Sequence, residues 1–266
     1  MTSGKFAAPT GTPVRDAATL ALLRAGATGT TPQVLLLGRP ASASFAPSTQ
    51  VFPGGALDES DREPGWHQLL PSGTEAGWDP RADLPVRIAA IRETYEECGV
   101  LLARDSGGLP GNPQQLAELE LTRARMRRRE PGLLLPALTR AGLLPAVDEI
   151  VFCAHWVTPE GLPKRFDTRF FLAALPPGQE PSPDPLGEHE SLRWVGPAQA
   201  LEEASRGECQ LLPPTRAVLA WLADSTGVED ALRRARGSAI TTVRPDLGDV
   251  TAARYPGLDL STLHRE

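Results

Sequence analysis

The chain has 266 residues, 41% of them hydrophobic, with a net charge of −6, so it can bury a sizeable core and does not have the charge of a protein that coats nucleic acid. No apolar run approaches the roughly 18 residues of a membrane span, and the N-terminus lacks a signal-peptide core. Three cysteines without a C-x-x-C pair do not make a disulfide framework, so we expect a reducing, cytoplasmic environment.

The predicted elements begin with two leucine-rich strands, 16–24 and 33–38, which form a hairpin around a Gly/Thr turn. Residues 56–83, rich in Gly, Pro and Trp, are interpreted as an inserted loop, and 175–190 as a proline-rich surface connection. Further strands are predicted at 150–157, 169–174 and 191–195, and helices at 84–103, 113–130, 133–141, 197–206 and 213–224. Because strands and helices interleave, the predicted fold class is α/β.

The helix over 84–103 contains the segment IAAIRETYEECGV, which concentrates carboxylates. Glu93, Glu96 and Glu97 are related by i, i+3 and i+4 and therefore share one face of the helix, while Gly99 suits its C-terminus. The opposite face follows the same period with apolar residues and is predicted to be buried. This apolar stripe consists of Ile88, Ile91, Tyr95, Cys98 and Leu102.

Carboxylates this close repel one another and need a compensating cation. Arg92 supplies one positive charge, and a hard divalent metal such as Mg²⁺ or Mn²⁺, which prefers oxygen ligands, would supply the rest. A solvated acidic face without any ligand is the alternative on charge alone.

Upstream, VFPGG (51–55) together with this helix resembles the Nudix hydrolase family, whose box reads G-x5-E-x7-R-E-u-x-E-E-x-G-u with u apolar. Gly55 matches the opening glycine, and the closing half is matched by Arg92, Glu93, Thr94, Glu96, Glu97, Gly99 and Val100. Thr94 is less apolar than the pattern asks. Arg92 follows Gly55 by 37 residues, so the box carries a 23-residue insertion.

The insertion leaves the isolated first glutamate of the box without a secure counterpart. Asp61 lies six residues after Gly55 and Leu84 lies eight before Arg92, and neither is a glutamate. In this interruption the chain resembles the coenzyme A diphosphatase branch of the family, whose members interrupt the box at the same place. Three later segments also resemble that branch: WVTPEGLPKRFDTRFFLAALP (156–176), LRWVGPAQAL (192–201) and LLPPTRAVLAWL (211–222).

The resemblance implies an α/β/α sandwich with a mixed sheet. The expected organisation is a Nudix domain over 1–224, with insertions at about 56–83 and 104–147, followed by a C-terminal extension over 225–266 to which we assign no role.

The resemblance also implies a metal held by Glu93, Glu96 and Glu97, with Glu93 and Glu97 in catalysis and Arg92 orienting a glutamate. Gly54 and Gly55 would let the backbone approach the metal helix or the substrate, because they have no Cβ. An acidic residue before 191–195 would act as a base outside the box. Glu190 or Glu188, which flank His189, are the candidates, and a solvated loop is the alternative.

Substrate-binding candidates are Arg39, Arg165 and Phe166, with Phe45, Asp167 and Arg169 as further members of the set. The alternative is that the Phe residues are strand core and the arginines cap the sheet in solvent. Five arginines within 123–129 form either a polyanion site or an exposed helical face. Trp66 and Trp78 form either a lid or loop packing, and we assign no role to His67, His155 and His264.

Three functions follow as hypotheses. The first is metal-dependent hydrolysis of coenzyme A or acyl-coenzyme A to 3′,5′-ADP and a phosphopantetheine. The second is pyrophosphatase action on NADH, ADP-ribose or a damaged nucleoside triphosphate, and the third is a non-catalytic Nudix-fold nucleotide-binding module. We expect a small-molecule nucleotide as the partner, no nucleic acid and no membrane, and we leave a homodimer open.

Overall fold

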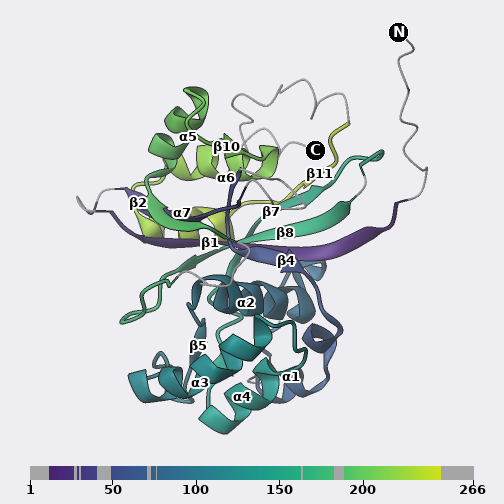
Figure 1. The fold of residues 1–266 in the computed structure, drawn as a ribbon, viewed down its shortest axis with the longest axis vertical. Coiled ribbons are helices and arrows are strands. Elements are labelled where there is room, and N and C mark those ends of the chain that lie inside the picture. The colour runs from purple at the N-terminus through teal and green to yellow at the C-terminus, as the bar shows by residue number, and fades with distance from the viewer. Residues whose placement is uncertain are drawn as a thin grey trace.

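The computed structural model describes residues 12–26, 29, 31–40, 49–70, 73–75, 77–162, 164–182 and 189–246. Within them a mixed β-sheet lies between two helical layers, with α2, α3 and α4 below the sheet and α5, α6 and α7 above it (Figure 1). The predicted α/β sandwich with a mixed sheet is therefore confirmed. The predictions on Phe45, Glu188 and His264 fall outside the described residues.

The long strand β1 organises the sheet. It pairs antiparallel with β2 and β4 and parallel with β8, and the strand order is β10-β3-β2-β1-β8-β7-β11, with β9 on β2. The predicted hairpin of the first two strands is confirmed, since Leu23 is opposite Val34. The strands are β1 (Val14–Ala25), β2 (Pro32–Gly38), β3 (Thr49–Val51), β4 (Gly54–Ala56), β7 (Val151–Val157), β8 (Arg165–Ala174), β9 (Ser191–Val195), β10 (Gln210–Leu211) and β11 (Thr242–Val243), with β5 (Ala103–Arg104) and β6 (Leu144–Pro145) in a separate pair.

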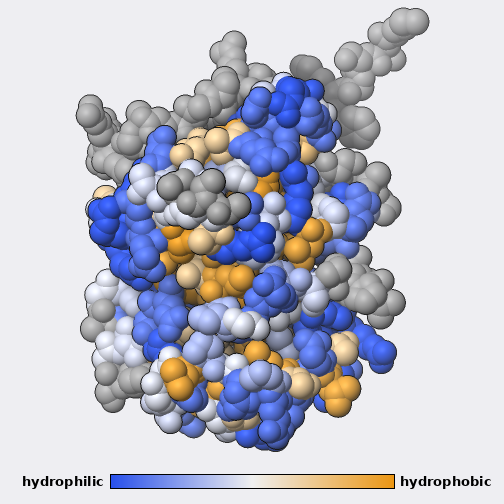
Figure 2. Space-filling view, turned by 90° about the vertical axis from the view of Figure 1, so that its left-hand side faces the viewer, coloured by the Kyte–Doolittle hydropathy of each residue, from blue (hydrophilic) through white to orange (hydrophobic). Residues whose placement is uncertain are grey.

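Both faces of the sheet are covered, and the central strands are accordingly apolar on both sides. In β1, Leu20 and Leu22 pack into the core below the sheet, while Ala21 and Leu23 pack into the core above it. Hydrophilic residues cover most of the face shown in Figure 2, and hydrophobic residues show across its middle.

The acidic segment forms α2 (Leu84–Cys98), with Pro85 in its first turn, and the predicted apolar stripe is buried. The predicted end of this helix at 103 is wrong. Gly99 adopts φ 75°, a left-handed cap that ends the helix at Cys98. The remaining helices are α1 (Gly65–Gln68), α3 (Pro113–Met126), α4 (Leu134–Ala141), α5 (Pro197–Ser205), α6 (Pro213–Ala223) and α7 (Val228–Arg236).

The two inserted regions pack against the core and against each other. Trp66 is buried and its indole N–H donates to the Ser60 carbonyl at 2.8 Å, so it packs in the core as well as lining the cavity described below. The Arg87 guanidinium lies 4.1 Å from the ring centre of Trp78, which is also a packing role. At Gly65, at the start of α1, a Cβ atom would lie 2.8 Å from a methyl of Leu135 in α4, so the two insertions are in close contact.

The described part of the C-terminal extension also joins the sandwich. Ala231, Leu232 and Ala235 of α7 are buried in the core above the sheet, and β11 pairs with β7. Within the described residues, the structure contains no helix of the length and apolarity needed to cross a bilayer.

Candidate active site

The acidic face of α2 borders a cavity of about 660 Å³. The cavity contains most of the predicted site residues. Those that line it are Arg39, Gly54, Gly55, Arg92, Glu93, Glu96, Glu97 and Phe166. Its walls also come from residues 126–135 of the second insertion, from 156–168 and from 212–215.

Glycine at position 55 is required by the close approach of β4 to α2. A Cβ atom built on Gly55 would lie 2.5 Å from Glu93 Oε1 and 2.8 Å from Oε2, so no larger residue fits without displacing this carboxylate. Gly55 is opposite Ala18 of β1. The strand therefore brings backbone, and no side chain, against Glu93.

Asp61 takes the acidic position that the interrupted box left unassigned. Its carboxylate is 1% exposed and receives two bonds from Arg92, Nε to Oδ1 at 2.8 Å and a terminal nitrogen to Oδ2 at 2.9 Å. Asp61 is six residues after Gly55, the spacing of the box, so the excess residues fall between Asp61 and Arg92. The sequence did not predict this pairing, because an aspartate stands where the box has a glutamate and because the insertion displaces Arg92.

Arg92 also organises the acids of its own helix. Its other terminal nitrogen donates to Glu93 Oε1 at 2.9 Å and to Glu96 Oε1 at 3.2 Å. Burial opposes the charge on Arg92, but the carboxylates of Asp61, Glu93 and Glu96 outweigh it and raise the Arg92 pKa.

The acidic face holds more negative charge than one arginine compensates. Burial raises the pKa of Glu93 to about 8, and the negative charges of Glu97 and Glu96 act in the same direction, against Arg92. Burial likewise raises the pKa of Glu96, again against Arg92. The site therefore favours either a proton or an additional cation.

Glu97 has a partner on each of its oxygens. The Gly54 backbone N–H donates to Oε2 at 2.9 Å, and Nε2 of His189 lies 2.9 Å from Oε1. Sequence reasoning assigned His189 no function, because it lies 92 residues from Glu97 and belongs to no motif. The available signal was its position beside Glu190, in the segment where we predicted a base.

The donor set fits a hard divalent metal in its chemistry. Glu93, Glu96 and Glu97 offer only carboxylate oxygens, which Mg²⁺ and Mn²⁺ prefer, and burial together with neighbouring negative charge raises the pKa of Glu93 and Glu96, so a cation there would favour their ionised forms. Within the described part of the chain, no three His, Cys, Asp or Glu side chains form a ready-made metal-binding group. Each carboxylate oxygen has two lone pairs, so the bonds to Arg92, Gly54 and His189 leave capacity for a metal.

The predicted substrate residues separate into two groups. Arg39 and Phe166 line the cavity. Arg165 is not among the described residues that line it, and its guanidinium donates to the carbonyls of Thr158 and Thr12 at 3.2 and 3.3 Å. The Arg169 guanidinium donates to the Asp16 carboxylate at 2.7 Å, so it links β8 to β1 instead of lining the cavity. Alternate residues of β8 thus divide between cavity and scaffold.

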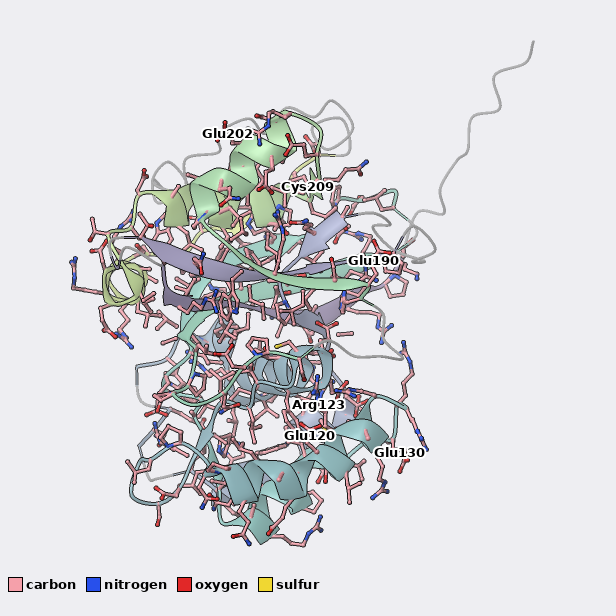
Figure 3. The ribbon with its side chains drawn as sticks, turned by 60° about the vertical axis from the view of Figure 1, so that its left-hand side comes forward. Glu120, Arg123, Glu130, Glu190, Glu202 and Cys209 are labelled. Atoms are coloured by element: carbon pink, nitrogen blue, oxygen red, sulfur yellow. The ribbon has the colours of Figure 1, made fainter. Side chains whose placement is uncertain are left out.

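The arginine cluster is similarly divided. Arg123 is buried beneath α2 and donates to the Ser182 hydroxyl at 2.8 Å and to the Glu96 carbonyl at 3.3 Å, so it holds structure (Figure 3). Arg127 donates to the same Glu96 carbonyl at 3.3 Å and lines the cavity together with Arg129. Glu190, which directly precedes β9 and is labelled in Figure 3, is exposed and absent from the described cavity lining.

A sheet of this order between helical layers, with the R-E-x-x-E-E sequence on α2 facing a cavity, defines the fold of a Nudix hydrolase. The family described as the NUDT19 Nudix domain matches residues 74–220, more than half of the chain. The chain belongs to this family, and the predicted membership of the Nudix hydrolases in the coenzyme A diphosphatase branch is confirmed.

Individual relatives agree with this placement. The acyl-coenzyme A diphosphatase NUDT19 of Gallus gallus is 30% identical over 237 residues, covering 74% of this chain and 63% of that protein. The Homo sapiens protein of the same name is 30% identical over 247 residues, covering 78% and 65%. The chain thus spans somewhat less than two thirds of the length of these relatives. A NUDIX hydrolase structure from Alicyclobacillus acidocaldarius is 31% identical, with a TM-score of 0.69, covering 84% of this chain and 96% of that one.

Proposed function

We propose that the protein hydrolyses the diphosphate of coenzyme A or acyl-coenzyme A, giving 3′,5′-ADP and a phosphopantetheine, with Mg²⁺ or Mn²⁺ bound at Glu93, Glu96 and Glu97. The observation that carries the proposal is the half-buried acidic face of α2 at the wall of a cavity. The raised pKa values of Glu93 and Glu96 support a demand for cations at this face.

The residues of the chain prepare this face for the reaction. Gly55 leaves space beside the Glu93 carboxylate, and Arg92, held by buried Asp61, orients Glu93 and Glu96 by charge-assisted hydrogen bonds. Gly54 and His189 hold Glu97. A bound divalent metal would neutralise phosphate oxygens and lower the pKa of a coordinated water.

The composition of the cavity walls supports a substrate with both anionic and apolar parts. Besides Arg92, its arginine and lysine residues are Arg15, Arg39, Arg127, Arg129 and Lys164. Its apolar residues include Met126, Leu133, Leu134, Leu135, Leu162 and Phe166. Coenzyme A combines a diphosphate and a 3′-phosphate, which arginine binds well, with a long pantetheine arm that an apolar wall accommodates.

The names of the relatives point to the same substrate class, since two of them are acyl-coenzyme A diphosphatases. Hydrolysis of NADH, ADP-ribose or a nucleoside triphosphate is the alternative, because the acidic face of α2 would serve any nucleoside diphosphate linkage equally. A non-catalytic nucleotide-binding module is less well supported, since all three helix carboxylates are present and border the cavity. A base at Glu190 stays a prediction.

The experiment that tests the proposed mechanism is substitution of the carboxylates. Glu96→Gln and Glu97→Gln should each lower kcat by orders of magnitude, because each removes a charged metal ligand, while the protein stays folded. The measurement is product formation from coenzyme A with Mg²⁺ or Mn²⁺, with Glu202→Gln on α5 as a control outside the cavity. Turnover at the wild-type rate in both variants would remove the mechanism.

A further inference from the structure

His189 is a residue of the cavity wall to which neither the Nudix box nor the sequence assigns a role. Its side chain is 4% exposed, and Nε2 lies 2.9 Å from Glu97 Oε1. A carboxylate only accepts hydrogen bonds, so Nε2 is the nitrogen that carries the proton, and its N–H donates a hydrogen bond to Glu97. The contact joins the segment before β9 to the last turn of α2.

Two donors therefore hold Glu97, the backbone N–H of Gly54 on one oxygen and the side chain of His189 on the other, and the backbone at both residues is held by neighbouring strands. Gly54, which donates to Oε2, is paired with Thr19 in the sheet, and a Cβ at this glycine would lie 2.5 Å from the Ala18 carbonyl. The N–H of Glu190, next to His189, donates to the Gly38 carbonyl at 2.9 Å. The Glu97 carboxylate is thus fixed between two strands.

The second imidazole nitrogen indicates that His189 does more than fill space. Nδ1 is buried and has no hydrogen-bond partner among the residues that the structure describes. An unpaired buried polar atom costs free energy, and an apolar side chain of similar size would avoid this cost. The chain has a histidine here instead, and this histidine directs an N–H donor at Glu97.

We propose that His189 is a positioning residue, whose Nε2–H sets the orientation of the Glu97 carboxylate toward the metal. The inference rests on the proposed function, in which Glu97 is a ligand. Removal of a group that orients a metal ligand typically costs about 10–100-fold in metal affinity or activity.

The test uses two variants of nearly equal size that differ in where the amide nitrogen sits. In His189→Gln, the side-chain NH₂ reaches the place of Nε2 and can donate to Glu97, whereas in His189→Asn it ends at the place of Nδ1 and cannot. We expect His189→Asn to weaken Mn²⁺ binding by about 10–100-fold and to lower kcat for coenzyme A by a similar factor, with KM changed far less. His189→Gln should recover most of both losses.

The measurement of Mn²⁺ affinity keeps this inference separate from the proposed function. Mn²⁺ affinity is measured on substrate-free protein by electron paramagnetic resonance, so it reports on Glu97 even if coenzyme A is not cleaved. His155→Gln, which alters another buried His–carboxylate pair, with Asp167, is the control and should leave Mn²⁺ affinity unchanged. Equal Mn²⁺ affinity in wild type and His189→Asn, or equal losses in His189→Asn and His189→Gln, would overturn the proposal.

Discussion

At the scale of single residues, the site depends on side chains whose partners are distant in sequence. Asp61 and Arg92 form a buried two-bond pair across 31 residues, and His189 meets Glu97 across 92. The sequence identified Arg92, Glu93, Glu96 and Glu97 because one helical turn brings them together. It could not assign Asp61 or His189, because no local period connects them to the helix.

The buried Asp61–Arg92 pair leads to a stability prediction. Asp61→Asn should lower the free energy of unfolding by about 1.5–3 kcal/mol, because it removes the carboxylate that accepts two charge-assisted hydrogen bonds from Arg92, while Glu93 and Glu96 still balance the guanidinium. Chemical denaturation measures this change. The control is Asp16→Asn, whose carboxylate is 40% exposed in its ion pair with Arg169 and should cost less than about 1 kcal/mol. Equal effects of the two substitutions would contradict the structural role given to Asp61.

At the scale of elements, the sequence predicted those with a strong local signal. The strand 191–195 was predicted at the bounds that the structure has, and β1, β2, α4, α5 and α6 were predicted within two residues at each end. The prediction that α2 continues to 103 failed because apolar residues continue beyond Gly99. These residues, Val100, Leu101 and Leu102, are buried in an extended segment instead of a helical turn.

The charge on α2 leads to a prediction about pH. Since burial raises the pKa of Glu93 from its ordinary 4.5 to about 8, the folded metal-free protein binds more protons than the unfolded chain across that interval. The contribution of Glu93 to stability is therefore present at acidic pH and is lost as pH rises from 4.5 to about 8. Above that range both states are ionised and the contribution is constant.

The measurement is the Tm of EDTA-treated protein across this pH range. Wild type should lose stability as pH rises, and Glu93→Gln, which cannot ionise, should show a shallower decline and a higher Tm near pH 8. Added Mg²⁺ should stabilise wild type most at the alkaline end. A Glu93→Gln profile parallel to that of wild type would show that the raised pKa of Glu93 does not contribute to the pH dependence of stability.

At the scale of the whole molecule, the cavity is assembled from many separate parts of the chain. The Nudix box supplies the acidic face, and the walls include residues 126–135 of the second insertion together with 156–168 and 212–215. The spacing of the Nudix box and the Gly, Pro and Trp content of residues 56–83 predicted that segment as an inserted loop. Residues of both insertions line the cavity, and Gly65 of the first insertion lies against Leu135 of the second, a contact that only the folded chain reveals.

The central claim is hydrolysis of the coenzyme A diphosphate at this cavity. The most direct measurement offers the Mg²⁺- or Mn²⁺-loaded protein equal concentrations of coenzyme A, 3′-dephospho-coenzyme A, ADP-ribose, NADH and a nucleoside triphosphate, and identifies the products by mass. We predict 3′,5′-ADP and a phosphopantetheine from coenzyme A, with a higher kcat/KM than for the 3′-dephospho form, because the basic residues of the cavity wall would contact the additional phosphate. Efficient hydrolysis of ADP-ribose, NADH or the triphosphate with coenzyme A left intact would contradict the claim.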